Sequence, residues 1–238
     1  MALGVDLAWT ARNGSGACAL DADGRVVDER ILVTDDELLE WVNDLASESA
    51  VVAVDAPLLV PNETGRRPCE SELSREYGSR WASTHSSNRQ LLLDRHGAIR
   101  GEVLAGELRR SGFGDLWSQT QRTLLEVYPH HAIIEAFGLP RRLAYKKGRI
   151  AERRSGLRRL NELILSLAKA DPPFIGPPVA ITDTMTGGEL KAIEDLLDAR
   201  ICAWVAAVWI RYGDTRVRVF GDAVSGHIVV PIGSVVAS

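Results

Sequence analysis

The chain opens with a strand-like segment that carries a single charged residue, and this residue limits what the chain can be. Over residues 2–10, Val5, Leu7 and Trp9 recur with a period of two, so Asp6 points to the opposite face of the predicted strand. A carboxylate that is buried without a partner costs several kcal/mol. We therefore predict that Asp6 is a metal ligand, which carboxylates from other parts of the chain join.

Two short turns after this strand predict an antiparallel meander. Turn signals at residues 12–14 and 21–24 separate strands that we expect at residues 16–20 and 26–33. Connections as short as these join antiparallel neighbours only. The chain is therefore expected to begin with three antiparallel strands.

A helix and a buried strand are predicted next. Residues 34–37 have the S/T-x-x-E form of a capping box, and they open a helix that we expect to end near Ser47. Residues 50–55 form an almost continuous apolar run, which is typical of a strand that is covered on both faces and parallel to its neighbour. Asp55 stands at the carboxyl end of this strand, because Pro57 cannot donate a hydrogen bond to a sheet.

The middle of the chain changes in composition. Residues 61–121 are richer in Arg, Glu, Ser and Gly, and we interpret them as a helical insertion over one edge of the sheet. Its helices are expected near residues 70–77 and 101–111. Strand character returns at residues 124–128, which contain Glu126.

The last part of the chain is predicted to be mainly helical. After a helix over residues 130–137, residues 141–159 contain many Lys and Arg against one acid, and an amphipathic helix begins at about Gly156. A short strand is expected at 179–182, and a second capping box precedes a long helix over 189–210. Two further strands are expected at 217–220 and 227–231.

Two aspartates on the long helix are candidates for function. Asp195 and Asp198 lie three residues apart and share one face with Cys202, where an almost wholly apolar helix must pack. Acids near a helix N-terminus also interact favourably with the helix dipole, but Asp198 lies beyond the first two turns. Glu126 is a further catalytic candidate, with a position on an exposed strand face as the alternative.

Carboxylates without histidine or thiolate partners suit Mg²⁺ or Mn²⁺, which prefer oxygen ligands. Two such ions can activate a water and stabilise the leaving oxygen in phosphodiester cleavage. The order of the predicted elements resembles the ribonuclease H-like fold, an α/β fold whose mixed sheet combines an antiparallel meander with parallel strands between helices. The resemblance implies one domain over residues 1–238, in which acids of the first strand, the fourth strand and the last helix meet.

Seven short segments carry a closer resemblance. They are Gly4–Ala8, Val54–Leu58, Arg67–Glu70, Glu126–Pro129, Tyr145–Lys146, Glu194–Ala199 and Gly226–Pro231. By these segments the chain resembles the family called domain of unknown function 429, which is regarded as predicted nucleases of the ribonuclease H fold. The Asp-x-x-Asp spacing on the last helix is similar to that of RuvC-type resolvases. The resemblance implies that Asp6, Asp55, Asp195 and Asp198 are the catalytic metal ligands.

We therefore predict a metal-dependent nuclease that acts on nucleic acid. Tyr145, Lys146 and Arg149 belong to the basic run and are candidates for binding phosphates, with a solvated helix face as the alternative. Two other functions stay open, a nucleotide-binding phosphotransferase or ATPase of the actin-like class and a non-catalytic interaction protein. The former would use a glycine-rich turn, for which Asn13–Gly16 is the only candidate.

Charge and composition restrict partners and location. A net charge of −4 gives no global attraction to nucleic acid or to an anionic membrane, so any such affinity must come from a local patch. The three cysteines lack the spacing of a zinc site or a disulfide framework. Because neither a signal peptide nor a confident membrane span is evident, we expect a cytoplasmic protein with no membrane partner.

Overall fold

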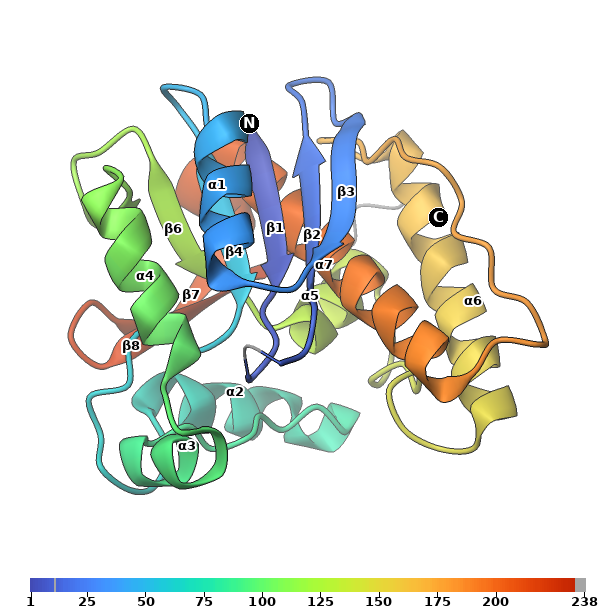
Figure 1. Ribbon diagram of the computed structural model, residues 1–238, viewed down its shortest axis with the longest axis horizontal. Coiled ribbons are helices and arrows are strands. Elements are labelled where there is room, and N and C mark those ends of the chain that lie inside the picture. The colour runs from blue at the N-terminus through green and yellow to red at the C-terminus, as the bar shows by residue number, and fades with distance from the viewer. Residues whose placement is uncertain (11, 234–238) are drawn as a thin grey trace.

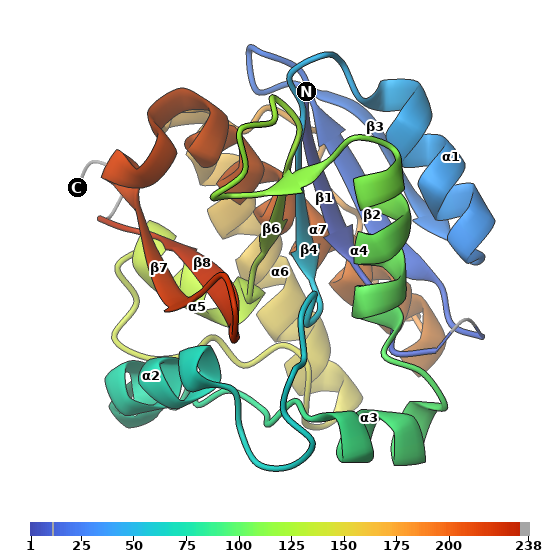
Figure 2. The same cartoon turned by 90° about the vertical axis from the view of Figure 1, so that its left-hand side faces the viewer.

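A mixed sheet of six strands forms the centre of the computed structural model, which describes residues 1–10 and 12–233 (Figure 1). The strand order is β3-β2-β1-β4-β6-β5. Helices cover both faces of the sheet, so the protein has three layers (Figures 1 and 2). The predicted fold class is confirmed: a mixed α/β sheet flanked by helices, consistent with a ribonuclease H-like arrangement.

The first three strands form the predicted antiparallel meander, and the remaining strands continue the sheet in parallel from β1. The meander consists of β1 (Ala2–Asp6), β2 (Ser15–Leu20) and β3 (Val26–Leu32). The parallel part consists of β4 (Val51–Asp55), β6 (Thr123–Glu126) and the short β5 (Gly114–Asp115).

The first strand is shorter than the predicted span of residues 2–10, because β1 ends at Asp6. The backbone N–H of Ala8 donates a hydrogen bond to the hydroxyl of Ser15, at 3.1 Å, rather than to a carbonyl of β2. The chain has left the sheet by Trp9, whose side chain is half-exposed. Asp6 therefore lies at the carboxyl end of a strand and not in its middle.

One face of the sheet packs against α1 (Asp35–Leu45) and α4 (Arg100–Arg110). Leu3 and Val5 of β1 join Leu38 and Leu104 of these helices in one apolar cluster. The N-terminus of α1 has the predicted capping box, since Thr34 accepts a hydrogen bond from the backbone of Glu37 and the Glu37 carboxylate accepts one from Thr34.

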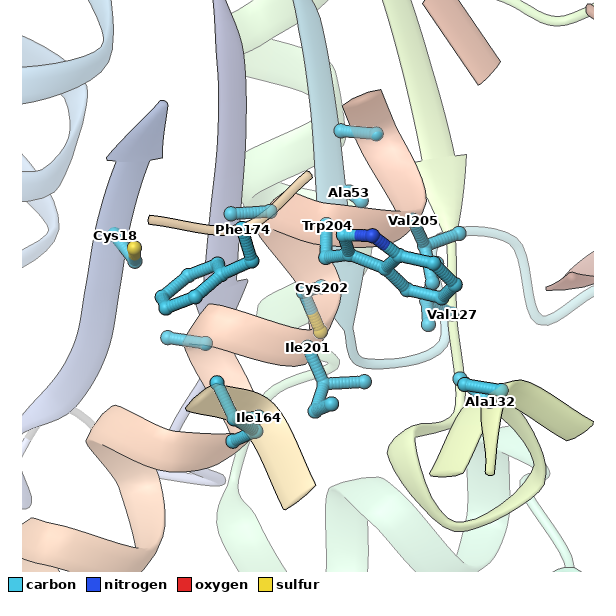
Figure 3. Close-up of a cluster of buried hydrophobic side chains, with 14 of the residues drawn as sticks. Cys18, Ala53, Val127, Ala132, Ile164, Phe174, Ile201, Cys202, Trp204 and Val205 are labelled. Carbon is cyan, nitrogen blue, oxygen red and sulfur yellow. The ribbon is translucent and has the colours of Figure 1, made fainter. Parts of the chain in front are cut away.

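The other face packs against the long helix α7 (Gly187–Tyr212), which α5 (Pro129–Ala136) and α6 (Ile150–Ser166) cover from outside. Figure 3 shows the core between these layers, where Cys18 and Ala53 of the sheet lie near Ile201 and Trp204 of α7. The predicted span and capping box of the long helix are confirmed.

Two predictions for the segment before α7 are wrong. Helix α6 begins at Ile150 rather than at Gly156, so the later part of the basic run is helical. Residues 179–182 are not a strand. The backbone N–H and carbonyl of Val179 instead exchange hydrogen bonds with the side-chain amide of Asn161 on α6, each at 3.3 Å. A side chain thus satisfies the groups that a neighbouring strand would have paired.

The segment between β4 and β6 holds three helices rather than the two predicted. They are α2 (Pro68–Tyr77), α3 (Arg89–His96) and α4. The leucines of α3 are consecutive instead of spaced by three or four residues, which hides the helix from pattern analysis. Helix α4 joins the core, whereas α2 and α3 lie beyond the carboxyl ends of β1 and β4 (Figure 2).

The predicted strands of the tail are confirmed as a hairpin of β7 (Val217–Asp222) and β8 (Gly226–Pro231). Phe220 and Ile228 of the hairpin pack against Leu73 of α2 and Ile134 of α5. Within the described residues, no helix is both long enough and apolar enough to cross a membrane. The short 3₁₀ helices are η1 (Gly78–Arg80), η2 (Leu167–Lys169) and η3 (Gly213–Arg216).

Candidate metal centre

Asp6 and Asp55 lie side by side because of the register of two parallel strands. β1 and β4 pair directly, and Asp6 is the register partner of Asp55. Each aspartate is the last residue of its strand, so both side chains stand at the same edge of the sheet. The carboxyl edge of an open α/β sheet is where ligands of such folds generally bind.

Two glycines allow α7 to approach this edge closely. A Cβ atom on Gly4 would lie 2.1 Å from the carbonyl oxygen of Ala199, and one on Gly16 would lie 2.1 Å from that of Asp195. Any larger residue at either position would push the helix away from β1 and β2. The close approach delivers the fully buried side chain of Asp198 to the end of β1.

Three of the aspartates form one cluster, as the resemblance to the ribonuclease H-like fold implied for them. One carboxylate oxygen from each of Asp6, Asp55 and Asp198 lies within 4.8 Å of the other two. One oxygen of Asp6 is buried and has no hydrogen-bond partner. The cluster thus offers three oxygen donors, including an unsatisfied one, which is the donor set that Mg²⁺ and Mn²⁺ prefer.

Tyr145 and Lys146 contact this cluster directly. The hydroxyl of Tyr145 donates a hydrogen bond of 2.7 Å to Asp198, and the ammonium of Lys146 lies 2.6 Å from the other oxygen of the same carboxylate. Tyr145 is buried, whereas Lys146 is partly exposed to the cavity. Two of the three predicted substrate-binding residues therefore lie at the site, and Lys146 supplies its nearest positive charge.

The cluster holds more negative charge than its surroundings compensate. Burial is the main cause that raises the pKa of Asp6 well above its ordinary value, and the neighbouring carboxylates add to it. Burial likewise raises the pKa of Asp55 to about 7, with Asp198 and Glu126 adding to the shift and Lys146 opposing it. A divalent cation at this position would remove the repulsion.

Asp195 lies beside the cluster but not in it. Its carboxylate pairs with the ammonium of Lys191, one turn earlier on α7. The charge of Asp195 still contributes to the raised pKa of Asp6, so the two carboxylates are near each other. Of the four aspartates expected to bind metal, the structure brings three together and places the fourth next to them in an ion pair.

Glu126 has a different environment from the one expected of a catalytic residue. It is buried rather than on an exposed strand face, and both of its oxygens are engaged. Arg67 donates two hydrogen bonds to it, at 2.5 and 2.8 Å, and the backbone N–H of Leu58 donates a third at 2.9 Å. Glu126 thereby holds the backbone that follows Asp55, which is a positioning role.

One known protein family matches this chain over most of its length. A family model described as "Protein of unknown function (DUF429)" matches residues 4–224. The chain is a DUF429 protein. No curated protein and no solved structure matches it. The family expected from the sequence motifs is therefore confirmed, and the chemistry of the DUF429 protein has to be argued from its own residues.

A cavity of about 640 Å³ opens over the carboxylates of the DUF429 protein. Five of the basic side chains that line it are Arg12, Arg142, Lys146, Lys147 and Lys191. Basic side chains beside Asp6 and Asp55 are suited to bind a phosphate ester, while a cation held by the carboxylates would share the charge of the phosphate. Arg149, the third predicted substrate-binding residue, does not line the cavity. It precedes α6, and its backbone N–H bonds to Glu152.

Sequence analysis missed several residues of this site. One is His130, which is buried, lines the cavity and packs against Tyr145. Gly4 and Gly16 could have been identified from the sequence, since a glycine inside a strand often marks a close backbone approach. The Asn13–Gly16 turn is no evident phosphate loop, because the Ser15 hydroxyl is buried and accepts the hydrogen bond from Ala8.

The raised pKa of Asp55 predicts that this residue destabilises the metal-free protein. Because the folded pKa exceeds that of the unfolded chain, stability falls as the pH rises from about 4 to about 7. Asp55→Asn should therefore raise the free energy of unfolding near pH 8 by about 2 kcal/mol, a value reduced for the partial exposure of the carboxylate. Chemical denaturation with a chelator present measures the free energy of unfolding of both proteins. An equal gain in stability at about pH 4 would contradict the raised pKa of Asp55.

Proposed function

We propose that the DUF429 protein is a Mg²⁺- or Mn²⁺-dependent hydrolase that cleaves phosphodiester bonds of nucleic acid. One observation carries the proposal: Asp6, Asp55 and Asp198 converge from β1, β4 and α7, and the first two line a cavity that basic side chains also line. Metal-assisted hydrolysis needs this combination, because the carboxylates hold the cations and the basic groups bind the phosphates. A cytoplasmic location is part of the proposal.

The donor set of the cluster fits a divalent metal ion. Asp6, Asp55 and Asp198 would hold it, and it would supply an activated water and charge stabilisation at the phosphorus. One oxygen of Asp6 has no hydrogen-bond partner, so it could bind a metal ion without losing another contact. Asp198 accepts a hydrogen bond from Tyr145 and pairs with Lys146. The Lys146 ammonium must therefore move away from its carboxylate oxygen if Asp198 is to become a metal ligand.

The basic residues have a separate task in this proposal. Lys146, half-buried beside the carboxylates, is placed to bind a phosphate oxygen once it leaves Asp198. Lys191 keeps Asp195 paired and borders the same cavity. Arg142 and Lys147 are exposed at its rim, where they can contact phosphates on either side of the one that reacts.

Replacing Lys146 by methionine should strengthen Mn²⁺ binding in the absence of substrate. The change removes the cation that competes for Asp198 and keeps most of the length of the side chain. We expect an affinity gain of about tenfold, equivalent to ~1.4 kcal/mol, by calorimetric titration. Cleavage should fall in the same variant. Weaker Mn²⁺ binding would show that Lys146 supports the cation site instead of competing with it.

The proposed activity is tested by incubating the protein and Mg²⁺ with single-stranded DNA, duplex DNA, an RNA–DNA hybrid and ATP. We expect cleavage of at least one nucleic acid and loss of that cleavage in Asp198→Asn. Lys169→Ala, an exposed change on η2, serves as the control and should retain it. ATP hydrolysis without nucleic-acid cleavage would overturn the proposal in favour of the phosphotransferase alternative.

A further inference from the structure

Separate segments of the chain line the cavity beside Asp6 and Asp55. The turn after β1 contributes Trp9 and Arg12, and the segment after α2 contributes residues 84–87. Residues 142–147 and the start of α7 complete the wall. Its volume of about 640 Å³ lies within the range of roughly 300–1,000 Å³ that is typical of small-ligand sites. Its size is that of a pocket for a small ligand.

The wall after α2 is held firmly in place. Both carboxylate oxygens of Glu70 accept hydrogen bonds from the backbone N–H of Ser87, and the hydroxyl of Thr84 donates to the carbonyl of Glu70. Glu70 also pairs with Arg67 at 3.0 Å, and Arg67 is bound to Glu126 of β6. These groups are buried. Residues 84–87 are therefore tied to the central sheet, so a duplex could not displace them at low cost.

An aromatic side chain lies at one end of the cavity. The Trp9 ring stacks on His96, with centroids 5.3 Å apart, and Trp9 as a whole is half-exposed. Trp9 is three positions after Asp6, so their Cα atoms are at most about 11 Å apart. Both residues line the cavity, so a nucleoside whose phosphate lies at the carboxylates could stack its base on Trp9. Base stacking on aromatic side chains is a common mode of single-strand recognition.

We propose that this cavity accepts one nucleoside unit of a single-stranded phosphodiester, which is either a dinucleotide or the free end of a strand. We expect it to exclude duplexes and the interior of a closed strand, because the cavity has the volume of a small-ligand site and its wall after α2 is tied to the central sheet. The inference rests on the proposed function, and it narrows the substrate of that site to molecules with an accessible end.

The test uses four substrates of matched sequence with Mn²⁺: a dinucleotide, a linear single strand, the same strand closed into a circle, and a blunt duplex. We expect the first two to be cleaved at least about 100-fold faster than the last two, a difference of ~2.7 kcal/mol in barrier. A circle that is cut as fast as the linear strand overturns this inference but leaves the proposed function intact. Absence of cleavage of every substrate overturns the proposed function.

A binding measurement separates the two proposals further. In Ca²⁺ instead of Mn²⁺, calorimetry should show tighter binding of the dinucleotide than of the closed circle, whether or not cleavage occurs. Trp9→Ala should weaken dinucleotide binding about tenfold or more through the lost stacking contact. Trp81→Ala is the matched control, since Trp81 is also exposed but does not line the cavity. Equal binding by wild type and Trp9→Ala would overturn the assignment of Trp9.

Discussion

Replacing Asp6 by asparagine is expected to abolish measurable Mn²⁺ binding. Asp6 faces Asp55 across the register of β1 and β4, and one of its carboxylate oxygens is buried without a hydrogen-bond partner. Residues that only support a metal ligand already contribute about 10–100-fold to affinity. Removal of a ligand should therefore weaken binding by more than about 100-fold in a calorimetric titration, while the isosteric amide preserves the fold.

The matched control for this experiment is Asp44→Asn. Asp44 is an exposed acid on α1, outside the cavity, so its replacement removes the same charge without touching the cluster. We expect Mn²⁺ affinity to be unchanged in this variant. If Asp6→Asn binds Mn²⁺ as tightly as Asp44→Asn does, the three carboxylates are not the cation site and the proposed function loses its basis.

Replacing Arg67 by methionine should produce the largest loss of stability. Arg67 is almost completely buried and binds two carboxylates, Glu70 and Glu126, which are buried as well. Methionine would leave both carboxylates without their cation, and breaking a buried ion pair from one side typically costs about 3–5 kcal/mol. We expect a decrease of about that size in the free energy of unfolding, measured by chemical denaturation with a chelator present.

Arg110→Met provides the comparison for this variant. Arg110 also pairs with a glutamate, Glu107, but both side chains are exposed on α4. Exposed pairs contribute about 0–1 kcal/mol, so this change should scarcely alter stability. An equally small effect for Arg67→Met would mean that the buried pair does not hold α2 to β6. Residues 84–87 would then be free to move, which would remove the argument for a closed cavity.

Much of the site could be predicted because it depends on the order of elements along the chain. Asp6 and Asp55 end adjacent parallel strands, and both strands are evident from their apolar patterns. Asp198 was identified because a charged residue on an otherwise apolar helix must face something other than the core. The meander and the long helix were predicted for the same reason, since their signals are local.

The remaining features depend on contacts that no local pattern records. Glu126 lies inside a strand in the sequence, but its role follows from Arg67, which is 59 residues earlier in the chain. Asp195 and Asp198 share a helix face, yet Lys191 pairs with one and Lys146 with the other. Tertiary packing determines which lysine pairs with which aspartate. The end of β1 at Asp6 likewise depends on the hydroxyl of Ser15, across the following turn.

The most direct test of the proposed metal centre is a crystal structure of the protein from crystals grown with Mn²⁺, with anomalous data collected to locate the metal. We predict an anomalous peak bounded by the carboxylate oxygens of Asp6, Asp55 and Asp198, with the Lys146 ammonium displaced from Asp198. A structure without a peak at this position, in which Lys146 still pairs with Asp198, would contradict the proposed metal centre.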